Sequence, residues 1–498
     1  MTLVVLGLYL LAVLAIGGLS HRLFRGTGED YFVATRSIGP FLLLMSLFGT
    51  HMTSFSLLGA SAEAYRSGIG VFALMASSSA LVAPAVFYFV GVRLWALGKR
   101  HGYLTQVEYF RERYQSEALG LVLFAVLVLL LIPYLLIGVM GGGVALTQIT
   151  AGAVPRWVGG LVITVVVLTY VTWGGLRGTA WANTFQTLVF MVLGLITLGV
   201  IVHQLGGWPA AMERLAAERP ELLVRGAGIS PLRMLSYSLI PLSVGMFPHI
   251  FLHWLSARRA DSFRLPMVAY PLCVAAVWLP SVLVGVLGAR EIPGLNAGAA
   301  NGILVAMIAR HAPDVLGGLL TAGVFAAIMS SLDSQVLALS TIFTRDIVAR
   351  FRRGKTWSEG QQVLTGRLFV VAVLAVTYLL SLVATPSIFK LGEWAFTGFA
   401  ALFPLVVAAL FWRRSTRQGA LAAVLTVVVL WLFFLQRGWN DPGYTVAGSG
   451  VMPVAVILLA AAAVLVGVSW LTPAPPAQVL ARFFPPAKAS AADGGGPR

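Results

Sequence analysis

The stretches SLFGTHMTSF (Ser46 to Phe55) and PLSVGMFPHI (Pro241 to Ile250) interrupt two otherwise apolar segments of the chain. Each stretch places glycine, hydroxyl groups and a histidine in the middle of a segment that is long enough to cross a membrane. An unsatisfied backbone group is costly in lipid unless it lines a polar cavity. Paired interruptions at corresponding positions of two halves therefore indicate a ligand-binding cavity of the kind that membrane transporters have.

The composition is typical of a polytopic membrane protein. Of 498 residues, 58% are hydrophobic and 10% are charged, whereas about a quarter of the residues are charged in soluble domains. The net charge of +16 comes from arginines that cluster in short loops between apolar segments, as topology signals do, and we expect no nucleic-acid partner. The single cysteine, Cys273, excludes a disulfide or a cysteine metal site within one chain.

Apolar segments of spanning length recur from one end of the chain to the other, and we count about thirteen. We therefore expect an all-α fold embedded in a lipid bilayer. The segments are 2-20, 38-62, 70-97, 117-148, 155-174, 179-204, 230-257, 265-288, 314-344, 362-385, 388-412, 417-435 and 450-471.

The loop charges predict the orientation of the chain. The first segment lacks a basic n-region and a small-residue cleavage site, which favours a retained helix over a signal peptide. With the N-terminus outside and the C-terminus in the cytoplasm, most lysines and arginines lie on the cytoplasmic side, as the positive-inside rule requires. The expected location is the inner (cell) membrane of a bacterium.

The two interruptions also suggest how the chain is divided. If each interrupted segment opens a set of five spans, the two sets have opposite orientations, as in the inverted repeats of many secondary transporters. The expected parts are an extra N-terminal helix and loop (1-37), a first repeat (38-204), an external loop (205-229), a second repeat (230-412), two C-terminal helices (413-471) and a mobile tail (472-498).

Four motifs spread over nearly the whole chain resemble the sodium:solute symporter family, which includes sodium-coupled proline, pantothenate, monocarboxylate and sugar cotransporters. The resemblance implies the five-plus-five inverted-repeat fold of the leucine transporter and Na+-coupled symport of a small organic solute. The motifs are YFVATRSIGP (Tyr31 to Pro40), VTWGGLRGTAWANTFQT (Val171 to Thr187), FPHIF (Phe247 to Phe251) and AAIMSSLDSQVLALSTIFTRD (Ala326 to Asp346).

The last motif contains the candidate cation ligands. Ala327, Ser330 and Ser331 are spaced i, i+3 and i+4 and share one face of a helix. Two hydroxyls and a carbonyl supply hard oxygens, which suit a hard cation. The resemblance implies that Na+ is completed there by the backbone carbonyls of Gly49 and Met52. The alternative is that the two serines only bond back to carbonyls of their own helix.

The chain departs from the family pattern at two positions where relatives carry carboxylates. His51 and Asn183 stand there, which favours a single coupled Na+. His51 either titrates and gates transport or is a hydrogen-bonded spacer. Asp333 follows the serines and either attracts Na+ or pairs with an arginine, so we regard Asn183 and Asp333 as possible coupling residues.

The candidates for solute binding and gating lie at the interruptions and in the last core span. Glu393 is an intramembrane carboxylate and a functional candidate by default; the alternative is an ion pair with Lys390 at i, i+3. The other candidates for the pocket or the gate are Thr50, His51, Thr53, Phe247, Pro248, Trp394 and Phe396.

The nature of the solute is only partly constrained. Exposed amide ends of broken helices favour an anionic group, and the span 70-97 has no Glu, Gln or Asn that would bind sugar hydroxyls. A monocarboxylate or an amino acid is therefore favoured over a sugar or a vitamin.

A cation channel is the alternative from another class, because broken helices also line pores. The sequence contains no catalytic motif, and we expect no enzyme activity, no cofactor other than Na+ as the coupling ion, and no obligatory protein partner.

Overall fold

The computed structural model describes residues 1-21, 37-225, 229-351, 357-384, 387-439, 441 and 443-484. This part of the chain is all-helical, and its only β contact is an isolated bridge between Ile38 and Ala257. Most of the motif YFVATRSIGP and the end of the predicted tail lie outside these residues. The all-α prediction is confirmed.

Ten helices of the described part are long and apolar enough to span a membrane, and the number rises to twelve if each of two bent pairs is one span. The predicted number of thirteen is not confirmed, because the apolar part of α1 (Thr2–His21) is short, Thr2–Ile16. The ten are Gly70–His101 (α5 to α7), Glu117–Ile149 (α9), Arg156–Trp173 and Thr179–Gln204 (both in α10, Arg156–Gln204), Ala260–Glu291 (η7 and α14, Arg264–Glu291), Asp314–Phe351 (α17, Asp314–Ile342, to α18), Glu359–Val383 (α19), Ile388–Phe411 (α20, Ile388–Ala401, and α21, Phe403–Phe411), Arg417–Gly438 (α22) and Pro453–Leu471 (α23).

The two bent pairs are the interrupted segments that the sequence predicts. The first consists of α3 (Pro40–His51) and the segment Phe55–Ser67 (η2 and α4, Ala60–Ser67), which meet at an angle of 60°. The second consists of Pro231–Gly245 (α12, Pro231–Tyr237, to η6) and α13 (Pro248–Ser256), at 49°. Pro248 is the first residue of α13, where the missing N–H of proline is tolerated.

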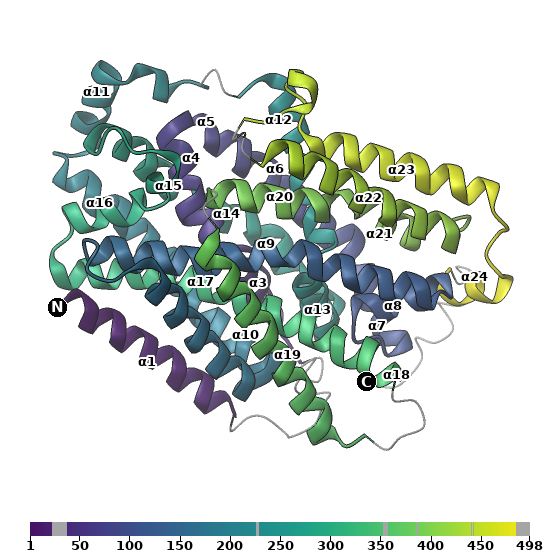
Figure 1. Ribbon diagram of the computed structural model, residues 1–498. Helices are drawn as coiled ribbons and strands as arrows, with labels where there is room; N and C mark the ends of the chain where they lie inside the picture. Colours follow the sequence, from purple (N-terminus) through teal and green to yellow (C-terminus); the bar gives the residue numbers. More distant parts are fainter. Residues whose placement is uncertain are drawn as a thin grey trace.

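Helix α17 forms the centre of the molecule and is buried along most of its length. It packs against α10, α9, α1, α13 and α3, and Figure 1 shows it among these helices. Short helices cover the two ends of the bundle: α11 (Trp208–Glu218), α15 (Ala297–Ala300) and α16 (Ile303–His311) at one end, and α8 (Gln106–Tyr114) and α24 (Ala477–Phe483) at the other.

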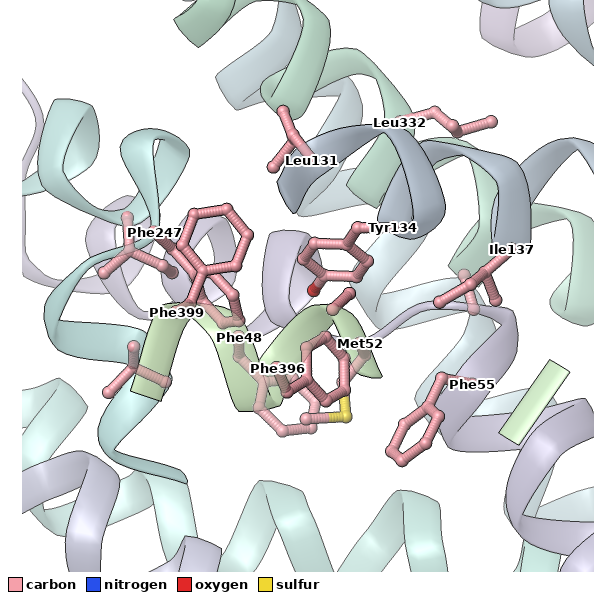
Figure 2. Packing of buried hydrophobic residues seen from close by; sticks show 14 of the residues in the cluster. Phe48, Met52, Phe55, Leu131, Tyr134, Ile137, Phe247, Leu332, Phe396 and Phe399 are labelled. Atoms are coloured by element: carbon pink, nitrogen blue, oxygen red, sulfur yellow. The ribbon is translucent and has the colours of Figure 1, made fainter. Parts of the chain in front are cut away.

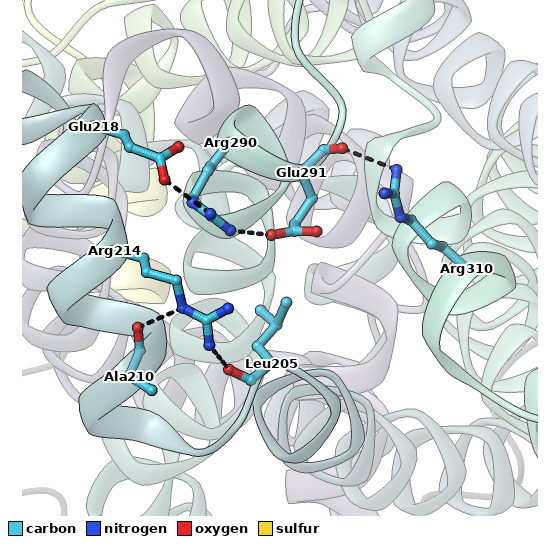
Figure 3. A network of polar contacts seen from close by, with 7 residues as sticks. All are labelled: Leu205, Ala210, Arg214, Glu218, Arg290, Glu291 and Arg310. Atoms are coloured by element: carbon cyan, nitrogen blue, oxygen red, sulfur yellow. Dashed lines mark hydrogen bonds and ion pairs between the residues drawn. The ribbon is translucent and has the colours of Figure 1, made fainter.

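A polar network joins helices at the α11 end (Figure 3). The guanidinium of Arg290, on α14, forms ion pairs with Glu218 of α11 at 2.8 Å and with Glu291. Arg310 of α16 donates to the backbone carbonyl of Glu291 at 2.9 Å. These contacts fix α11 and α16 on the end of α14.

At the α8 end, Asp346 joins the last part of the α17 span to α8. Its carboxylate accepts from Arg111 at 3.0 Å and from the hydroxyl of Thr105 at 2.5 Å. Phe483 of α24 stacks on Tyr103, with ring centroids 6.3 Å apart. Helix α24, in the part of the segment 472-498 that the structure describes, therefore lies against Tyr103 and against Tyr109 of α8.

Close helix packing generates a first prediction. A Cβ at Gly285 of α14 would lie 2.2 Å from the backbone carbonyl oxygen of Ser61 in α4, whereas a Cβ at Gly199 of α10 would meet nothing within 4 Å. Gly285→Ala must push two helix backbones apart and should destabilise the protein by about 1–3 kcal/mol. Gly199→Ala is the matched control and should be neutral or stabilising. Thermal unfolding in detergent measures both; equal melting temperatures for the two variants would contradict this packing.

Candidate functional site

A cavity lies where the two bent pairs meet. The gaps between its walls are mostly narrower than a water molecule. Such a space holds about one water molecule, so a solute must be small and must move the walls apart. The central cavity is lined by His51, Phe55, Ser56, Ser79, Tyr237, Ile240, Pro241, Ser243, Trp278 and Phe396.

His51, the last residue of α3, is held in the wall of the central cavity by tyrosines. Its Nδ1 forms a hydrogen bond with the hydroxyl of Tyr270 on α14, and the two rings stack with centroids 6.0 Å apart. Its backbone carbonyl lies 3.5 Å from the hydroxyl of Tyr134 on α9. His51 is therefore a hydrogen-bonded residue whose side chain lines the cavity.

An aromatic cluster closes the central cavity on the side of α20 (Figure 2). Phe396 packs edge-on against Phe55 and Tyr134, each with ring centroids 4.9 Å apart, and against Phe247 at 5.6 Å. Phe247 is fully buried at the second break. Of the predicted pocket residues, Phe396 lines the cavity directly and Phe247 lies behind it.

Three of the predicted cation ligands, Gly49, Ala327 and Ser330, lie together. The hydroxyl of Ser330 donates to the carbonyl oxygens of Gly49 and Ala327, at 2.8 and 3.2 Å. The backbone of Met52 is extended, with φ −82° and ψ 123°, which turns its carbonyl out of the helical ladder. The hydroxyl of Ser331 bonds back to Ile328 of its own helix at 3.1 Å, as the alternative interpretation expects for both serines.

Asp333 is fully buried, and its hydrogen bonds come from neutral groups. Tyr170 of α10 donates to it at 3.0 Å. When the Asn183 amide oxygen accepts from Ser334 at 2.8 Å, the Asn183 nitrogen donates to both carboxylate oxygens of Asp333, at 3.0 and 3.2 Å, and to the carbonyl of Ser330 at 3.0 Å.

Among the described residues, no arginine forms an ion pair with Asp333. The predicted alternative, in which Asp333 pairs with an arginine, is therefore not supported by the described contacts. The carboxylate of Asp333 on α17 instead lies beside Asn183 of α10.

Glu393 and Trp394 lie away from the central cavity. They line a separate pocket with Lys390, Thr397, Tyr444, Met452 and Pro453, between α20 and the chain that precedes α23. In the described part of the chain, neither Glu393 Oε1 nor Lys390 Nζ has a hydrogen-bond partner. The i, i+3 ion pair that the spacing suggests is therefore absent from the described contacts.

The other predicted residues lie at the breaks. Thr53 Oγ1 accepts from the backbone N–H of Phe55 at 3.0 Å and so starts the second half of the first bent pair. Thr50 is fully buried and its hydroxyl has no partner among the described residues. Pro248 starts α13. These three residues build the breaks and do not line the central cavity.

Sequence reasoning missed Tyr270, Trp278 and Tyr134, which surround or line the central cavity. Each is a single aromatic residue in a long apolar helix. Such residues usually pack or lie in the interfacial belt, so only the meeting of α9, α14 and the first break identifies them.

Comparison with known proteins identifies the family of the chain. The model of the sodium:solute symporter family matches residues 31–426. The chain belongs to the sodium:solute symporter family. The predicted resemblance is therefore confirmed over most of the chain, and Na+-coupled symport is the activity of the family.

Curated relatives of similar length are Na+-coupled transporters. The chain is 27% identical to the sodium/pantothenate symporter of Escherichia coli over 484 residues, which cover 95% of this chain and 97% of the relative. It is 26% identical to the sodium/proline symporter of Salmonella typhimurium over 469 residues, which cover 89% and 90%. Two different solutes among these relatives leave the solute of this chain open.

Solved structures show the same fold. A Na+-coupled sialic acid symporter in a substrate-bound outward-open state superposes with a TM-score of 0.78 at 18% identity, over 95% of this chain and 98% of that chain. A nucleobase-cation-symport-1 family transporter gives 0.57 at 13% identity, over 91% and 97%. The leucine-transporter fold that the sequence predicts is confirmed.

The contacts of Asp333 generate a second prediction. Tyr170→Phe removes a donor from a buried carboxylate and should destabilise the protein by about 1–3 kcal/mol. Tyr378→Phe is a matched control, because that hydroxyl bonds to the Trp157 carbonyl at 3.3 Å at an exposed position, and its effect should stay within about 0.5 kcal/mol. Thermal unfolding compares the two; a Tyr170→Phe protein as stable as the control would refute the assigned hydrogen bond.

Proposed function

We propose that the chain carries one Na+ together with a small monocarboxylate or amino acid by alternating access. Na+ would be held by the carbonyls of Gly49, Met52 and Ala327 and by the hydroxyls of Ser330 and Ser331. The observation that supports this site best is the contact between Ser330 and Gly49, 2.8 Å across two helices.

The ligand geometry supports the proposal in two ways. Ser330 Oγ already lies within hydrogen-bond distance of two of the proposed carbonyl ligands, so small shifts of these oxygens would allow them to surround one ion. The extended backbone at Met52 supplies a carbonyl of the kind that coordinates Na+ in broken helices of transporters. Ser331 would need to rotate its hydroxyl away from Ile328.

Asp333 supplies negative charge close to this site. It follows Ser331 by two residues, and the amide of Asn183 bridges its carboxylate to the carbonyl of Ser330. A buried carboxylate with only neutral partners favours a nearby cation. We therefore propose that Asp333 stabilises bound Na+ and that Asn183 orients it.

The central cavity is the proposed solute site, because it lies at both breaks and shares α3 with the Na+ site. His51, Phe396 and the residues behind them form its wall. Glu393 and Trp394 would act in gating from their separate pocket. Movement of α20, which packs against the second bent pair and α9 and carries Phe396 in the cavity wall, would then open and close the solute site during alternating access.

Na+ supplies the driving force. One positive charge that enters down about 100 mV releases about 2.3 kcal/mol. A zwitterionic amino acid carried with one Na+ would benefit from this electrical term, whereas a monoanion carried with one Na+ moves no net charge and depends on the Na+ concentration gradient alone.

We also propose the orientation and division of the chain. The integral membrane fold of a bacterial-type symporter fits the inner membrane, with the N-terminus outside and the C-terminus in the cytoplasm, so that α8 and α24 face the cytoplasm. The two five-span repeats would be 38-204 and 230-412, each opened by one bent pair.

Uptake into proteoliposomes tests the Na+ site. Ser330→Ala removes the hydroxyl that joins α17 to α3 and should lower the apparent Na+ affinity at least about tenfold. Ser281→Ala is the matched control, because that buried hydroxyl bonds only to Val277 of its own helix at 2.8 Å, and its Na+ affinity should equal that of the wild type. Saturable uptake without a Na+ requirement, or a Na+ current without solute, would refute symport.

A further inference from the structure

The side chain of Trp278 has a buried donor without a partner in the central cavity. Trp278 of α14 is 4% exposed and lines the cavity, and its indole Nε1 has no hydrogen-bond partner in the described part of the chain. An indole N–H only donates, and a buried unpaired donor is costly. The cavity therefore has a place for a hydrogen-bond acceptor from the solute.

His51 provides a second donor at the same cavity. Either group can donate in the hydrogen bond between the Tyr270 hydroxyl and Nδ1 of His51. The arrangement in which Tyr270 donates also gives the hydroxyl hydrogen a partner, and a neutral imidazole whose Nδ1 accepts carries its hydrogen on Nε2. The Tyr270 contact therefore favours the form of His51 that carries an N–H at Nε2, in a side chain that lines the cavity.

The central cavity offers no anionic partner for an ammonium group, whereas its hydroxyl groups, on Ser56, Ser79, Tyr237 and Ser243, can donate to a carboxylate. None of its lining residues carries a carboxylate or an amide side chain. Nearby carbonyls are already engaged: that of Gly49 accepts from Ser330, that of His51 lies near the Tyr134 hydroxyl, and that of Ser243 accepts from the backbone of Met246 at 2.9 Å and of Phe247 at 3.1 Å.

The start of a helix adds to the preference for an anion. Phe55 and Ser56, the first residues of the second half of the first bent pair, line the cavity. The N-terminus of a helix carries partial positive charge, which favours an anionic group. The rest of the wall is apolar, with Phe55, Ile240, Pro241 and Phe396, and suits a short hydrocarbon chain.

From these observations we infer that the solute is a short monocarboxylate without an amino group, bound through its carboxylate by the N–H groups of Trp278 and His51. Tyr270 is a positioning residue that keeps the hydrogen of His51 on Nε2. The inference rests on the proposed function and chooses between the two solute classes which that proposal leaves open.

A binding panel tests the class of solute. Wild-type protein is melted with and without Na+ in the presence of straight-chain monocarboxylates of two to six carbons, their α-amino acids and their primary amides. A ligand of the native state raises the melting temperature. We expect a Na+-dependent rise with at least one monocarboxylate and an affinity at least about tenfold lower for its α-amino and amide analogues. Equal or tighter binding of the α-amino acid, or no binding of any monocarboxylate, would overturn the inference.

Tryptophan variants test the donor. Trp278→Phe should lower the carboxylate affinity about tenfold or more, since a hydrogen bond to a charged group is lost. Trp254→Phe is the matched control: its buried indole Nε1 also has no partner among the described residues, but it packs against Phe87 and Phe251 away from the cavity. Unchanged affinity in Trp278→Phe, or an equal loss in both variants, contradicts the assignment.

Tyr270→Phe tests the positioning role and serves if Trp278→Phe does not fold. Without the hydroxyl, His51 can present an acceptor to the cavity, so the ratio of affinities for the monocarboxylate and its α-amino analogue should fall; an unchanged ratio refutes this role.

Stabilisation by Na+ alone, measured in wild type and in Ser330→Ala, distinguishes failure of this inference from failure of the proposed function. A Na+ effect that Ser330→Ala abolishes, together with a preference for amino acids, overturns only this inference, whereas absence of any Na+ effect overturns the proposed function as well.

Discussion

Two helices that break inside an apolar medium place one constraint on the whole structure: the backbone groups freed at the breaks need partners. The partners come from side chains of other elements. Ser330 of α17 donates to the carbonyl of Gly49, the Tyr134 hydroxyl of α9 approaches that of His51, and Gln106 of α8 donates to that of Met246 at 3.0 Å. The same contacts that satisfy the breaks therefore hold α17, α9 and α8 against the bent pairs and leave a polar cavity between them.

The first break would serve both of the proposed sites. The Gly49 carbonyl contacts the Ser330 hydroxyl of α17, while His51, two residues later, is held in the wall of the central cavity by Tyr270 of α14. A shift of α3 that moves Gly49 must also move His51, since the two residues lie within one helical turn. Coupling between two ligands requires such a shared element with different contacts in different states, and this short stretch of chain would be the element that couples Na+ to the solute.

Much of the fold could be predicted from the sequence, because a break inside an apolar segment and an alanine carbonyl with two serine hydroxyls at i, i+3 and i+4 are local patterns. The contact of Ser330 with Gly49 agrees with that prediction. The partners of Asp333 could not be predicted, since Tyr170 and Asn183 reach it from a helix distant in sequence. The i, i+3 spacing of Lys390 and Glu393 suggested a pair that the described contacts do not contain, because spacing on a helix permits a contact without requiring it. Tyr270 and Trp278 could not be predicted, because aromatic residues in apolar helices usually pack or lie in the interfacial belt. Only the position of α14 beside the breaks brings them to the central cavity.

The distribution of charge explains why binding of an anionic solute would depend on Na+. The lining of the central cavity has donors but no lysine or arginine, so a carboxylate there lacks a permanent protein countercharge. Opposite unit charges 4 Å apart attract by about 4 kcal/mol at an effective dielectric constant of about 20, and each 1.4 kcal/mol changes affinity about tenfold. An ion bound across α3 and α17 would supply this attraction from the other side of the first break. A fixed arginine in the cavity would bind the carboxylate without Na+ and abolish the dependence. Neutral donors in the central cavity and the buried Asp333 beside the proposed Na+ site would thus make the binding of each ligand depend on the other.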